Sequence, residues 1–338
     1  MRLLVTGGLG FIGSHFIRWA LAQDPAVTVV NLDAQTYAGD PANLADVDPA
    51  RYTWIRGDIR DPEAVARAFA AGVDAVVHCA AESHVDRSLL SAEACLTTNV
   101  LGTQVLLDAA RTHGVRRFVH VSTDEVYGAL APDEPPATEA HALAPRSPYA
   151  ASKAAADLLV GAAVATWNLP AVITRGTNTY GPFQHPEKFI PLFITHALEG
   201  RDLPLYGDGL QIRDWLHVTD HVAAIWTVLE RGRVGAVYNI GARNEQPNRA
   251  VAERICALLG VDPARIRSVA DRPGHDRRYA LDPTRLETEL GWRPRVPFAE
   301  GLAETVRWYA THRAWWERRR DATFWTYYRQ QYGERLRP

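Results

Sequence analysis

One segment constrains the fold more than any other: the glycine-rich stretch Thr6-Gly7-Gly8-Leu9-Gly10-Phe11-Ile12-Gly13 near the amino terminus. It follows an apolar run, Leu3–Thr6, that predicts a strand, and it opens a helical pattern over Phe11–Ala22. Glycine permits a tight turn and lets a pyrophosphate approach the backbone, while the start of the helix offers unpaired N–H groups. The pattern therefore predicts a dinucleotide-binding turn between a first strand and a first helix.

An acidic residue supports that prediction. Asp33 stands about 20 residues beyond the glycine turn, at the end of the next predicted strand, Thr28–Leu32. A carboxylate there can accept hydrogen bonds from both ribose hydroxyls of adenosine and would repel the 2′-phosphate of NADP, so NAD is the expected cofactor. Asp58-Ile59 follows a weaker strand, where the adenine would rest. A purely structural glycine turn with an incidental acid is the alternative, and the motifs further along the chain weaken it.

Strands and helices alternate through the first half of the chain. Ala75–His78 and Arg117–Val121 are predicted as further buried strands, and Ala92–His113 as one long helix. This βαβ rhythm predicts an α/β fold, a Rossmann-type, doubly wound parallel sheet covered on both faces.

Glycine and proline become denser from about residue 180. We expect a smaller C-terminal α/β substrate-binding lobe over the carboxyl edge of the sheet, with Val237–Ile240 returning to the first lobe as a strand. The expected division is 1–176 plus about 212–242 for NAD binding, and about 177–211 plus 243–338 for the substrate.

The overall composition argues against several classes of function. With a formal net charge of −2, the chain has no basic field for nucleic acid or an anionic membrane, and its first apolar run is too short for a signal peptide or a membrane span. Three widely spaced cysteines show neither a disulfide framework nor a metal motif, and the 12 histidines are dispersed, so we expect a cytoplasmic protein without a metal. The basic run Arg318–Arg320 is expected to form a solvated helix face, and the aromatic C-terminal stretch to form packed helices.

Tyr149 and Lys153 form a YxxxK pattern, which places both side chains on one face of a helix. A tyrosine hydroxyl has a pKa of about 10 in water, and a neighbouring ammonium and an oxidised nicotinamide favour its phenolate. Such a tyrosine can take the proton of an alcohol while hydride leaves the same carbon. The pair follows a strand that ends in Ser122-Thr123. Neither of these two residues is expected to be a hydrolase nucleophile, because no glycines of a nucleophile elbow flank them.

The segment Ser122–Gly128 has the sequence STDEVYG, and together with the glycine turn and the YxxxK pair it carries a family likeness. The chain resembles the extended short-chain dehydrogenases/reductases over nearly its whole length. Within that superfamily, this segment resembles the signature of the dTDP-glucose 4,6-dehydratases, whereas epimerases of the fold usually carry small or hydroxyl residues where Asp124 and Glu125 stand. Four further segments are similar to the same family: Ala80–Ser88, Gly181–Lys188, Gln211–Trp215 and Asp271–Tyr279.

The resemblance implies conversion of dTDP-glucose to dTDP-4-keto-6-deoxyglucose, with NAD regenerated in place. Oxidation at C4 makes the C5 proton acidic, and the resemblance implies that Glu125 is the base at C5 and Asp124 the acid at the C6 oxygen. Thr123 is implied to hydrogen-bond the C4 hydroxyl beside Tyr149, which Lys153 supports. Two adjacent carboxyls with opposite duties need environments that push their pKa values apart, so Asp124 is expected to be protonated in the working complex. A capped loop is the structural alternative, because Thr-Asp-Glu also suits a helix start.

The resemblance also implies two sets of binding residues. Those implied for the cofactor are Gly7, Gly10, Phe11, Ile12, Gly13, Asp33, Ala34, Gln35, Thr36, Asp58, Ile59, Cys79, Ala80, Ala81, Ser83, Thr98, Tyr149, Lys153 and Thr179. Those implied for the substrate are Ser83, Thr123, Asn178, Lys188, Phe189, Pro204, Leu205, Tyr206, Arg213, Asn248, Asp271, Arg272 and His275. A guanidinium fork suits phosphate oxygens, so Arg213 and Arg272 are the expected diphosphate ligands. Thr179 departs from the family, which has a second asparagine before Tyr-Gly-Pro, and Phe189 replaces its usual leucine.

Related activities stay open: a UDP- or CDP-glucose 4,6-dehydratase, or a nucleotide-sugar epimerase or decarboxylase of the same fold. A protein of a different class, a catalytically silent NAD-binding sensor, would have no need of Thr123, Tyr149 and Lys153. The resemblance further implies a homodimer joined through the helices near Ala92–His113 and Tyr149–Thr166. The product could serve rhamnose for a cell envelope or a deoxysugar of a secondary metabolite, and the sequence favours neither.

Overall fold

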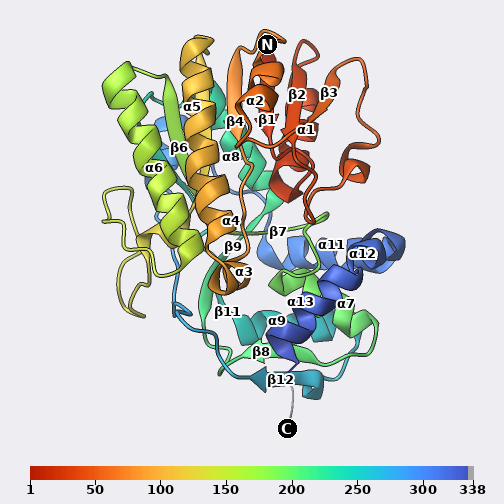
Figure 1. Cartoon of the computed structure of the whole chain (residues 1–338). Coiled ribbons are helices and arrows are strands. Elements are labelled where there is room, and N and C mark those ends of the chain that lie inside the picture. Colours follow the sequence, from red (N-terminus) through yellow and green to blue (C-terminus); the bar gives the residue numbers. More distant parts are fainter. Residues whose placement is uncertain (334–338) are drawn as a thin grey trace.

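A sheet of seven parallel strands forms the centre of the structure, a computed structural model that describes residues 1–333 (Figure 1). From one edge to the other the strands are β10 (Val237–Ile240), β6 (Ala171–Gly176), β5 (Arg117–Thr123), β4 (Ala75–His78), β1 (Arg2–Thr6), β2 (Thr28–Asp33) and β3 (Tyr52–Arg56). The chain builds outward from β1 to β3 and then crosses back to add β4 on the other side of β1. The predicted doubly wound α/β sheet is confirmed, and the carboxyl ends of strands beside such a reversal are where ligands of these sheets bind.

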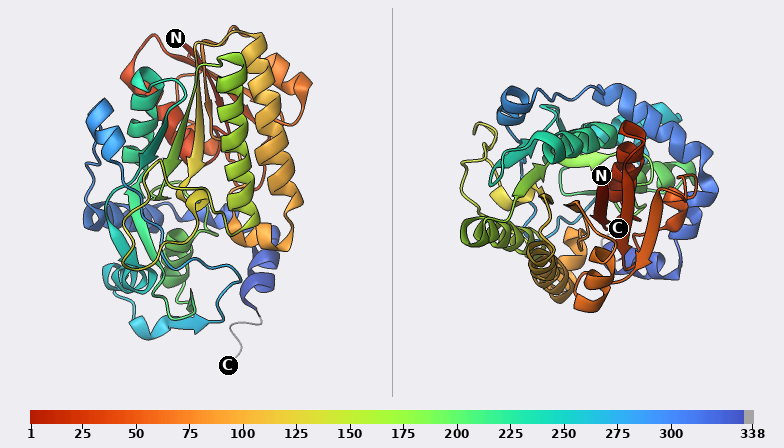
Figure 2. Two further views of the ribbon diagram at one scale, coloured as in Figure 1. Left: turned by 90° about the vertical axis from the view of Figure 1, so that its left-hand side faces the viewer. Right: turned by 90° about the horizontal axis from the view of Figure 1, so that it is seen from above.

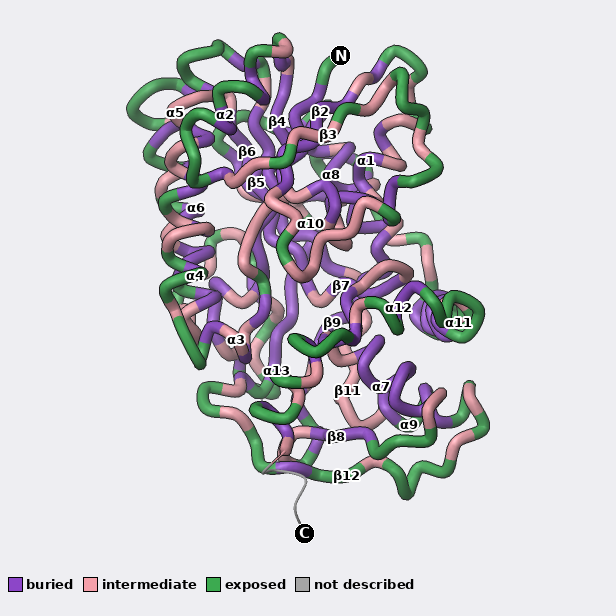
Figure 3. The backbone as a smooth tube through the Cα atoms, turned by 45° about the vertical axis from the view of Figure 1, so that its right-hand side comes forward, coloured by how far each residue is buried: buried purple, intermediate pink, exposed green. Residues whose placement is uncertain are grey.

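Helices cover both faces of the sheet (Figure 2). One face carries α1 (Phe11–Gln23), α8 (Val218–Arg231) and α10 (Thr284–Leu290), and the other carries α2 (Pro62–Phe69), α5 (Thr103–Thr112) and α6 (Pro148–Trp167). Each face buries its own apolar core, with Phe16 and Ile225 on the first and Phe69 and Leu106 on the second. The backbone is therefore most continuously buried along the strands (Figure 3).

The helix predicted over Ala92–His113 is not a regular α-helix. A first turn, α4 (Glu93–Cys95), runs into a π-helical segment, η2 (Leu96–Gly102), before α5 completes the rod. Asn99 in this segment accepts the N–H of Glu82 and donates to its carbonyl, both at 2.9 Å. π-Helical turns are rare and frequent at functional sites, and this one fixes the chain just beyond the end of β4.

A smaller body of short sheets and helices lies beyond the carboxyl ends of the large sheet (Figure 1). Its strands are β7 (Asn178–Tyr180), β9 (Ile212–His217) and β11 (Glu245–Pro247) in one sheet, and β8 (Leu203–Tyr206) and β12 (Ile266–Val269) in another. Its helices are α7 (Phe189–Leu198), α9 (Asn248–Leu259), α11 (Phe298–Thr311), α12 (Arg313–Arg319) and α13 (Ala322–Tyr332). The remaining short elements are α3 (Val85–Leu90) and the 3-10 turns η1 (Pro41–Leu44), η3 (Asp124–Tyr127) and η4 (Pro263–Arg265).

The aromatic C-terminal helices pack into the core of this smaller body, which confirms the prediction; Trp316 is fully buried there. The prediction of a solvated face for Arg318–Arg320 is wrong for its last two members. The side chain of Arg319 is only 7% exposed, pairs with Asp40 and lies over the ring of Trp315. Arg320 is buried, pairs with Glu199 at 2.9 Å and lies over the ring of Trp325. Guanidinium groups stack readily on aromatic faces, so packing against the surrounding tryptophans determines the position of the Arg320 side chain.

Two neighbouring helical segments carry exposed apolar side chains on their outer faces. Leu158 of α6 is 66% exposed and Leu101 of η2 is 60% exposed. Contiguous exposed apolar side chains commonly mark an interaction surface. Among residues 1–333, no helix combines the length and the apolar character needed to cross a membrane.

Asp220, near the start of α8, ties the large sheet to the segment that leads into α11. Its buried carboxylate accepts the N–H groups of Arg295 at 2.9 Å and Val296 at 2.8 Å. Asp220→Ala is expected to lower the free energy of unfolding by about 2 kcal/mol, because two part-buried N–H donors lose their acceptor. Asp61→Ala, which removes only the exposed cap of α2, should cost about 1 kcal/mol. Urea unfolding measures both, and equal losses would contradict the role given to Asp220.

Candidate active site

A cavity opens at the carboxyl ends of β1, β2 and β4, where the glycine turn leads into α1. Gly7 has a left-handed φ of 70°, and a Cβ there would lie 2.7 Å from the backbone of Ala80. Only glycine fits at this position, because other residues disfavour that conformation and lack the space. Helix α1 begins without a side-chain cap, so the N–H groups of its first turn are available to an anionic ligand.

Asp33 forms the wall of this cavity at the end of β2. Its carboxylate accepts the N–H of Leu9 at 2.9 Å and the N–H of Gln35 at 2.7 Å, which fixes its orientation. Burial raises the pKa of Asp33, and the two amides oppose that rise. Backbone amides for a pyrophosphate and a carboxylate for a ribose are the donor and acceptor set that a dinucleotide requires.

Most residues predicted for the cofactor line this cavity. They are Gly7, Gly10, Phe11, Ile12, Gly13, Asp33, Ala34, Thr36, Asp58, Ile59, Cys79, Ala80, Ala81, Ser83 and Thr98. Gln35 does not, because its backbone turns into the left-handed region (φ 53°) and its side chain lines a neighbouring hollow. Sequence reasoning missed Arg60 and Gln184, which also line the cavity; Arg60 directly follows Asp58-Ile59, which was the available signal.

Thr179 does not line the cavity either. Its hydroxyl contacts Nδ1 of His221 at 2.7 Å, and its carbonyl accepts the side-chain amide of Gln184 at 2.9 Å. The position predicted for a cofactor contact is therefore turned inward, because the buried imidazole takes the hydroxyl.

Asp124 and Glu125 lie side by side at the end of β5, where Thr123 caps the short turn η3. Thr123 Oγ1 accepts the N–H of Glu125 at 3.2 Å and donates to Asp124 at 3.1 Å. The hydroxyl of Thr177 donates to the other oxygen of Asp124 at 3.0 Å. Thr123 therefore caps this turn, as the structural alternative predicts, and the same turn carries the two carboxyls.

The two carboxyls have different surroundings. Asp124 is buried, and burial together with the charge of Glu125 raises its pKa to about 7. Glu125 faces the second cavity described below; burial raises its pKa as well, and the charges of Arg272 and Arg213 oppose that rise. Asp124 therefore holds its proton up to near-neutral pH, as the sequence predicts.

Tyr149 stands at the start of α6 and hydrogen-bonds Thr123. Burial and the charges of Glu125 and Asp124 raise the pKa of its phenol. The ammonium of Lys153 donates to the carbonyl of Val121 at 2.7 Å, and burial lowers the pKa of Lys153 to about 8. Burial and the two carboxyls therefore raise the pKa of Tyr149 in the protein without a ligand. The predicted lowering, which also needs the charge of an oxidised nicotinamide, stays a prediction.

The second cavity is walled by residues of α3, α7, β8 and β9. Of the residues predicted for the substrate, it is lined by Ser83, Asn178, Lys188, Phe189, Pro204, Leu205, Tyr206, Arg213, Asn248, Arg272 and His275. Thr123 and Asp271 do not line this cavity. The carboxylate of Asp271 pairs instead with the ring of His275 at 2.6 Å. Sequence reasoning missed Asp86, which pairs with Arg272 at 3.1 Å although it stands within the matching segment Ala80–Ser88.

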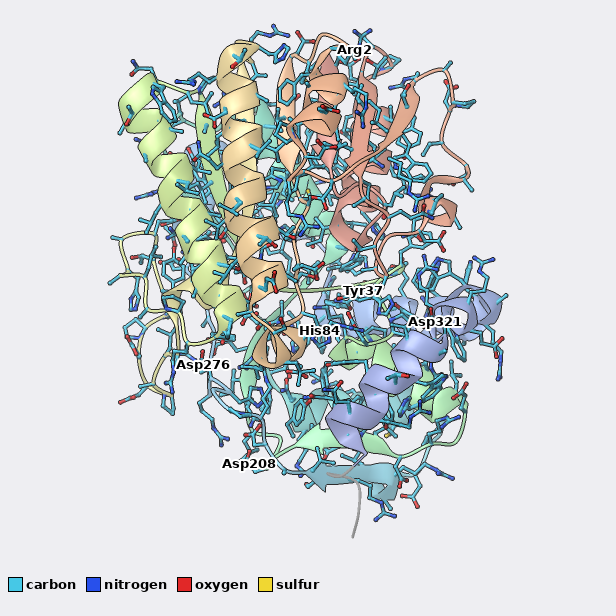
Figure 4. All side chains as sticks on the ribbon, viewed as in Figure 1. Arg2, Tyr37, His84, Asp208, Asp276 and Asp321 are labelled. Atoms are coloured by element: carbon cyan, nitrogen blue, oxygen red, sulfur yellow. The ribbon has the colours of Figure 1, made fainter. Side chains whose placement is uncertain are left out.

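The two cavities meet at Ser83, Glu187 and Lys188, which line both. The ammonium of Lys188 donates to the carbonyl of Ser83 at 2.7 Å. Figure 4 labels Tyr37 and His84 at this level, between the large sheet and the smaller body. A ligand in one cavity can therefore reach a ligand in the other.

A family model described as GDP-mannose 4,6 dehydratase matches residues 4–305. The chain belongs to this family. A relative in this dehydratase family, the dTDP-glucose 4,6-dehydratase of Streptomyces niveus, is 52% identical over 322 residues, which cover 94% of this chain and 95% of that protein. The dTDP-glucose 4,6-dehydratase 1 of Escherichia coli K12 is 47% identical over 363 aligned positions, which cover 99% of this chain and 100% of that protein.

Solved structures agree with this membership of the dehydratase family. The crystal structure of DesIV, a dTDP-glucose 4,6-dehydratase from Streptomyces venezuelae with NAD and TYD bound, has a TM-score of 0.91 at 54% identity and covers 94% of this chain and 100% of its own. A UDP-glucose 4-epimerase from Thermus thermophilus in complex with NAD has a TM-score of 0.86 at 33% identity, covering 92% and 100%. The family resemblance and the fold predicted from the sequence are thus confirmed.

Asp124 is expected to titrate near neutrality. Because burial and the Glu125 charge raise its pKa to about 7, its protonated form should disappear as pH rises through about 7. Difference infrared spectroscopy of the carboxyl C=O band measures this, with Asp124→Asn to assign the band. Glu125→Gln removes the neighbouring charge and should move the titration to lower pH; an unchanged titration would show that the assigned cause is wrong.

Proposed function

We propose that this protein is a dTDP-glucose 4,6-dehydratase, which converts dTDP-glucose to dTDP-4-keto-6-deoxyglucose with the help of NAD. The observation that carries the proposal is the adjacent carboxyl pair, Asp124 and Glu125, beside Thr123 and Tyr149, with Glu125 in the lining of the second cavity. An oxidation alone needs the tyrosine, whereas loss of water also needs a base and an acid. Relatives named dTDP-glucose 4,6-dehydratase, at 47% to 54% identity, support the same activity.

The first cavity fits NAD. The amides of the turn Gly7–Gly13 would hold its pyrophosphate at the start of α1, and the fixed carboxylate of Asp33 its adenosine ribose. When bound there, NAD supplies the hydride acceptor for C4 of the sugar and the hydride donor for C6. DesIV, which was crystallised with NAD, supports this assignment.

Tyr149 is the base for the C4 hydroxyl, and Thr123 hydrogen-bonds the same oxygen. Because burial and the two carboxyls raise the pKa of Tyr149, its phenolate needs positive charge close by. The ammonium of Lys153 and the charge of the oxidised nicotinamide together provide it.

Glu125 faces the cavity in which the hexose would lie, so it takes the C5 proton that the C4 ketone has made acidic. Asp124, whose pKa is raised to about 7, keeps the proton that it gives to the departing C6 oxygen. The side chains are neighbours in sequence, yet one is buried behind the turn and the other faces Arg213 and Arg272. This difference separates the acid from the base.

The second cavity supplies the contacts for a nucleoside diphosphate. Arg213 and Arg272 are cations for the two phosphates, with Asn248 beside them. Phe189 and Tyr206 present aromatic faces for the nucleoside. Thymine as the base follows from the named relatives, and UDP- or CDP-glucose remains the alternative substrate.

We also propose the predicted division into an NAD-binding lobe, 1–176 plus about 212–242, and a nucleotide-sugar lobe, about 177–211 plus 243–338, with one change. Strand β9 (Ile212–His217) belongs to the nucleotide-sugar lobe, because it pairs with β7 and β11. A homodimer through α6 and the long helix would cover Leu101 and Leu158. Three free cysteines suit a reducing, cytoplasmic setting.

The purified protein is expected to form a 4-keto-6-deoxy product from dTDP-glucose, and to do so faster than from UDP-glucose or CDP-glucose. Tyr149→Phe should lower kcat by about a thousandfold, because the base for the C4 hydroxyl is lost. Chromatography of the sugar nucleotides with a keto-group assay measures both. Absence of product from all three substrates, with Tyr149→Phe equal to the parent, would refute the proposed activity.

Glu125→Gln should uncouple the steps of the reaction. Oxidation at C4 needs Tyr149 and stays possible, whereas loss of water stalls because no base reaches C5. Reduced cofactor should therefore accumulate on the enzyme while product formation falls at least about a hundredfold. Normal turnover by this variant would show that Glu125 is not the base.

A further inference from the structure

Helix α6 carries a third ionisable side chain in line with Tyr149 and Lys153. Asp157 follows Lys153 by about one helical turn, on the same face, and all three side chains are buried. The dehydratase chemistry uses the first two and leaves Asp157 without a role. A carboxylate at this depth is costly unless cations compensate it, so its neighbours decide what it does.

Asp157 lies between two cations. Its Oδ2 accepts a hydrogen bond from Nε of Arg175 at 2.8 Å. Its Oδ1 lies 3.5 Å from Nε2 of His120, and the same Nε2 lies 3.5 Å from Nζ of Lys153. The imidazole of His120 therefore stands between the carboxylate and the ammonium.

The other groups around Lys153 carry no charge. Burial and the neighbouring cations hold the pKa of His120 well below its usual value, and burial lowers the pKa of His78 to about 3. Burial raises the pKa of the Cys79 thiol to about 12, so it stays protonated at neutral pH. Among the described residues, Asp157 has the strongest effect in raising the pKa of Lys153 against the lowering by burial.

We propose that Asp157 is a positioning residue, whose carboxylate acts across the His120 ring to hold Lys153 as an ammonium at the carbonyl of Val121, where it supports the Tyr149 phenolate. The inference rests on the proposed function, because it assigns Asp157 to the C4 oxidation. Arg175 keeps the carboxylate in place.

The hydrogen bonds continue beyond Arg175. Its Nη1 donates to the hydroxyl of Tyr127 at 2.8 Å, and that hydroxyl donates to Asn239 at 2.8 Å. These residues share the network of Asp157, but none of them places a negative charge beside Lys153. They therefore provide controls for a purely structural role.

The test isolates the oxidation. In a Glu125→Gln background, which stops before water loss, formation of reduced cofactor is followed against pH after mixing with dTDP-glucose. Asp157→Asn removes the charge and keeps the shape, so Lys153 loses its proton more easily and the phenolate loses support. The pH of half-maximal oxidation should rise by about one unit, and the rate at neutral pH should fall about tenfold. Affinity for dTDP-glucose should stay unchanged, because Asp157 lines neither cavity.

Tyr127→Phe is the matched control. It cuts the hydrogen bond to Arg175 without removing a charge, so it should lower the thermal midpoint and keep the parent pH profile. Asp157→Asn could fail to fold because Arg175 is left unpaired. The double variant Asp157→Asn with Arg175→Gln removes both buried charges and should show the same rise in the pH of half-maximal oxidation.

A parent-like pH profile in the folded Asp157 variant overturns the inference, as does an equal shift in Tyr127→Phe. A different result would refute the proposed function itself: no reduced cofactor formed by the Glu125→Gln protein at any pH. That result would also refute the role assigned to Asp157.

Discussion

The burial of Asp124 next to Glu125 is the constraint on which the rest of the site depends. Two carboxyls this close cannot both ionise cheaply, so the one with less compensation keeps its proton. Asp124 receives hydrogen bonds from the hydroxyls of Thr123 and Thr177, whereas Glu125 lines the second cavity, where the charges of Arg272 and Arg213 lower its pKa against the effect of burial. The proposed acid and the proposed base thus differ through their surroundings and not through their residue types.

The large sheet supplies that difference. Strands β5 and β6 pair in parallel so that Thr123 lies opposite Gly176, which brings Thr177 beside the carboxyl of Asp124. Gly176 is required at this point, because a Cβ there would lie 2.6 Å from the His221 ring. The same ring takes the hydroxyl of Thr179. One buried imidazole therefore fixes the backbone on both sides of the residue that binds Asp124.

Local patterns made much of this predictable. The glycine turn, the strand ending at Asp33 and the YxxxK pair each lie within one stretch of chain, and their spacing sets which side chains share a cavity or a helix face. The failures came from contacts between distant segments. Thr179 turns to a histidine of α8, and Arg320 stacks among tryptophans that a charge pattern ignores. Neither of these has a signal at its own position.

The electrostatic balance around Tyr149 also orders the reaction. Burial, Glu125 and Asp124 raise its pKa, and the proposed mechanism sets against them the ammonium of Lys153, with Asp157 behind it. The charges of the protein alone therefore leave the phenol protonated, and a bound oxidised nicotinamide would supply the positive charge that favours the phenolate. A base that forms only beside the oxidised cofactor cannot take a proton from the sugar before a hydride acceptor is in place. After hydride has left C4 that charge would be absent, so the phenol would keep the proton it had taken while the proposed base, Glu125, and the proposed acid, Asp124, act at C5 and at the C6 oxygen.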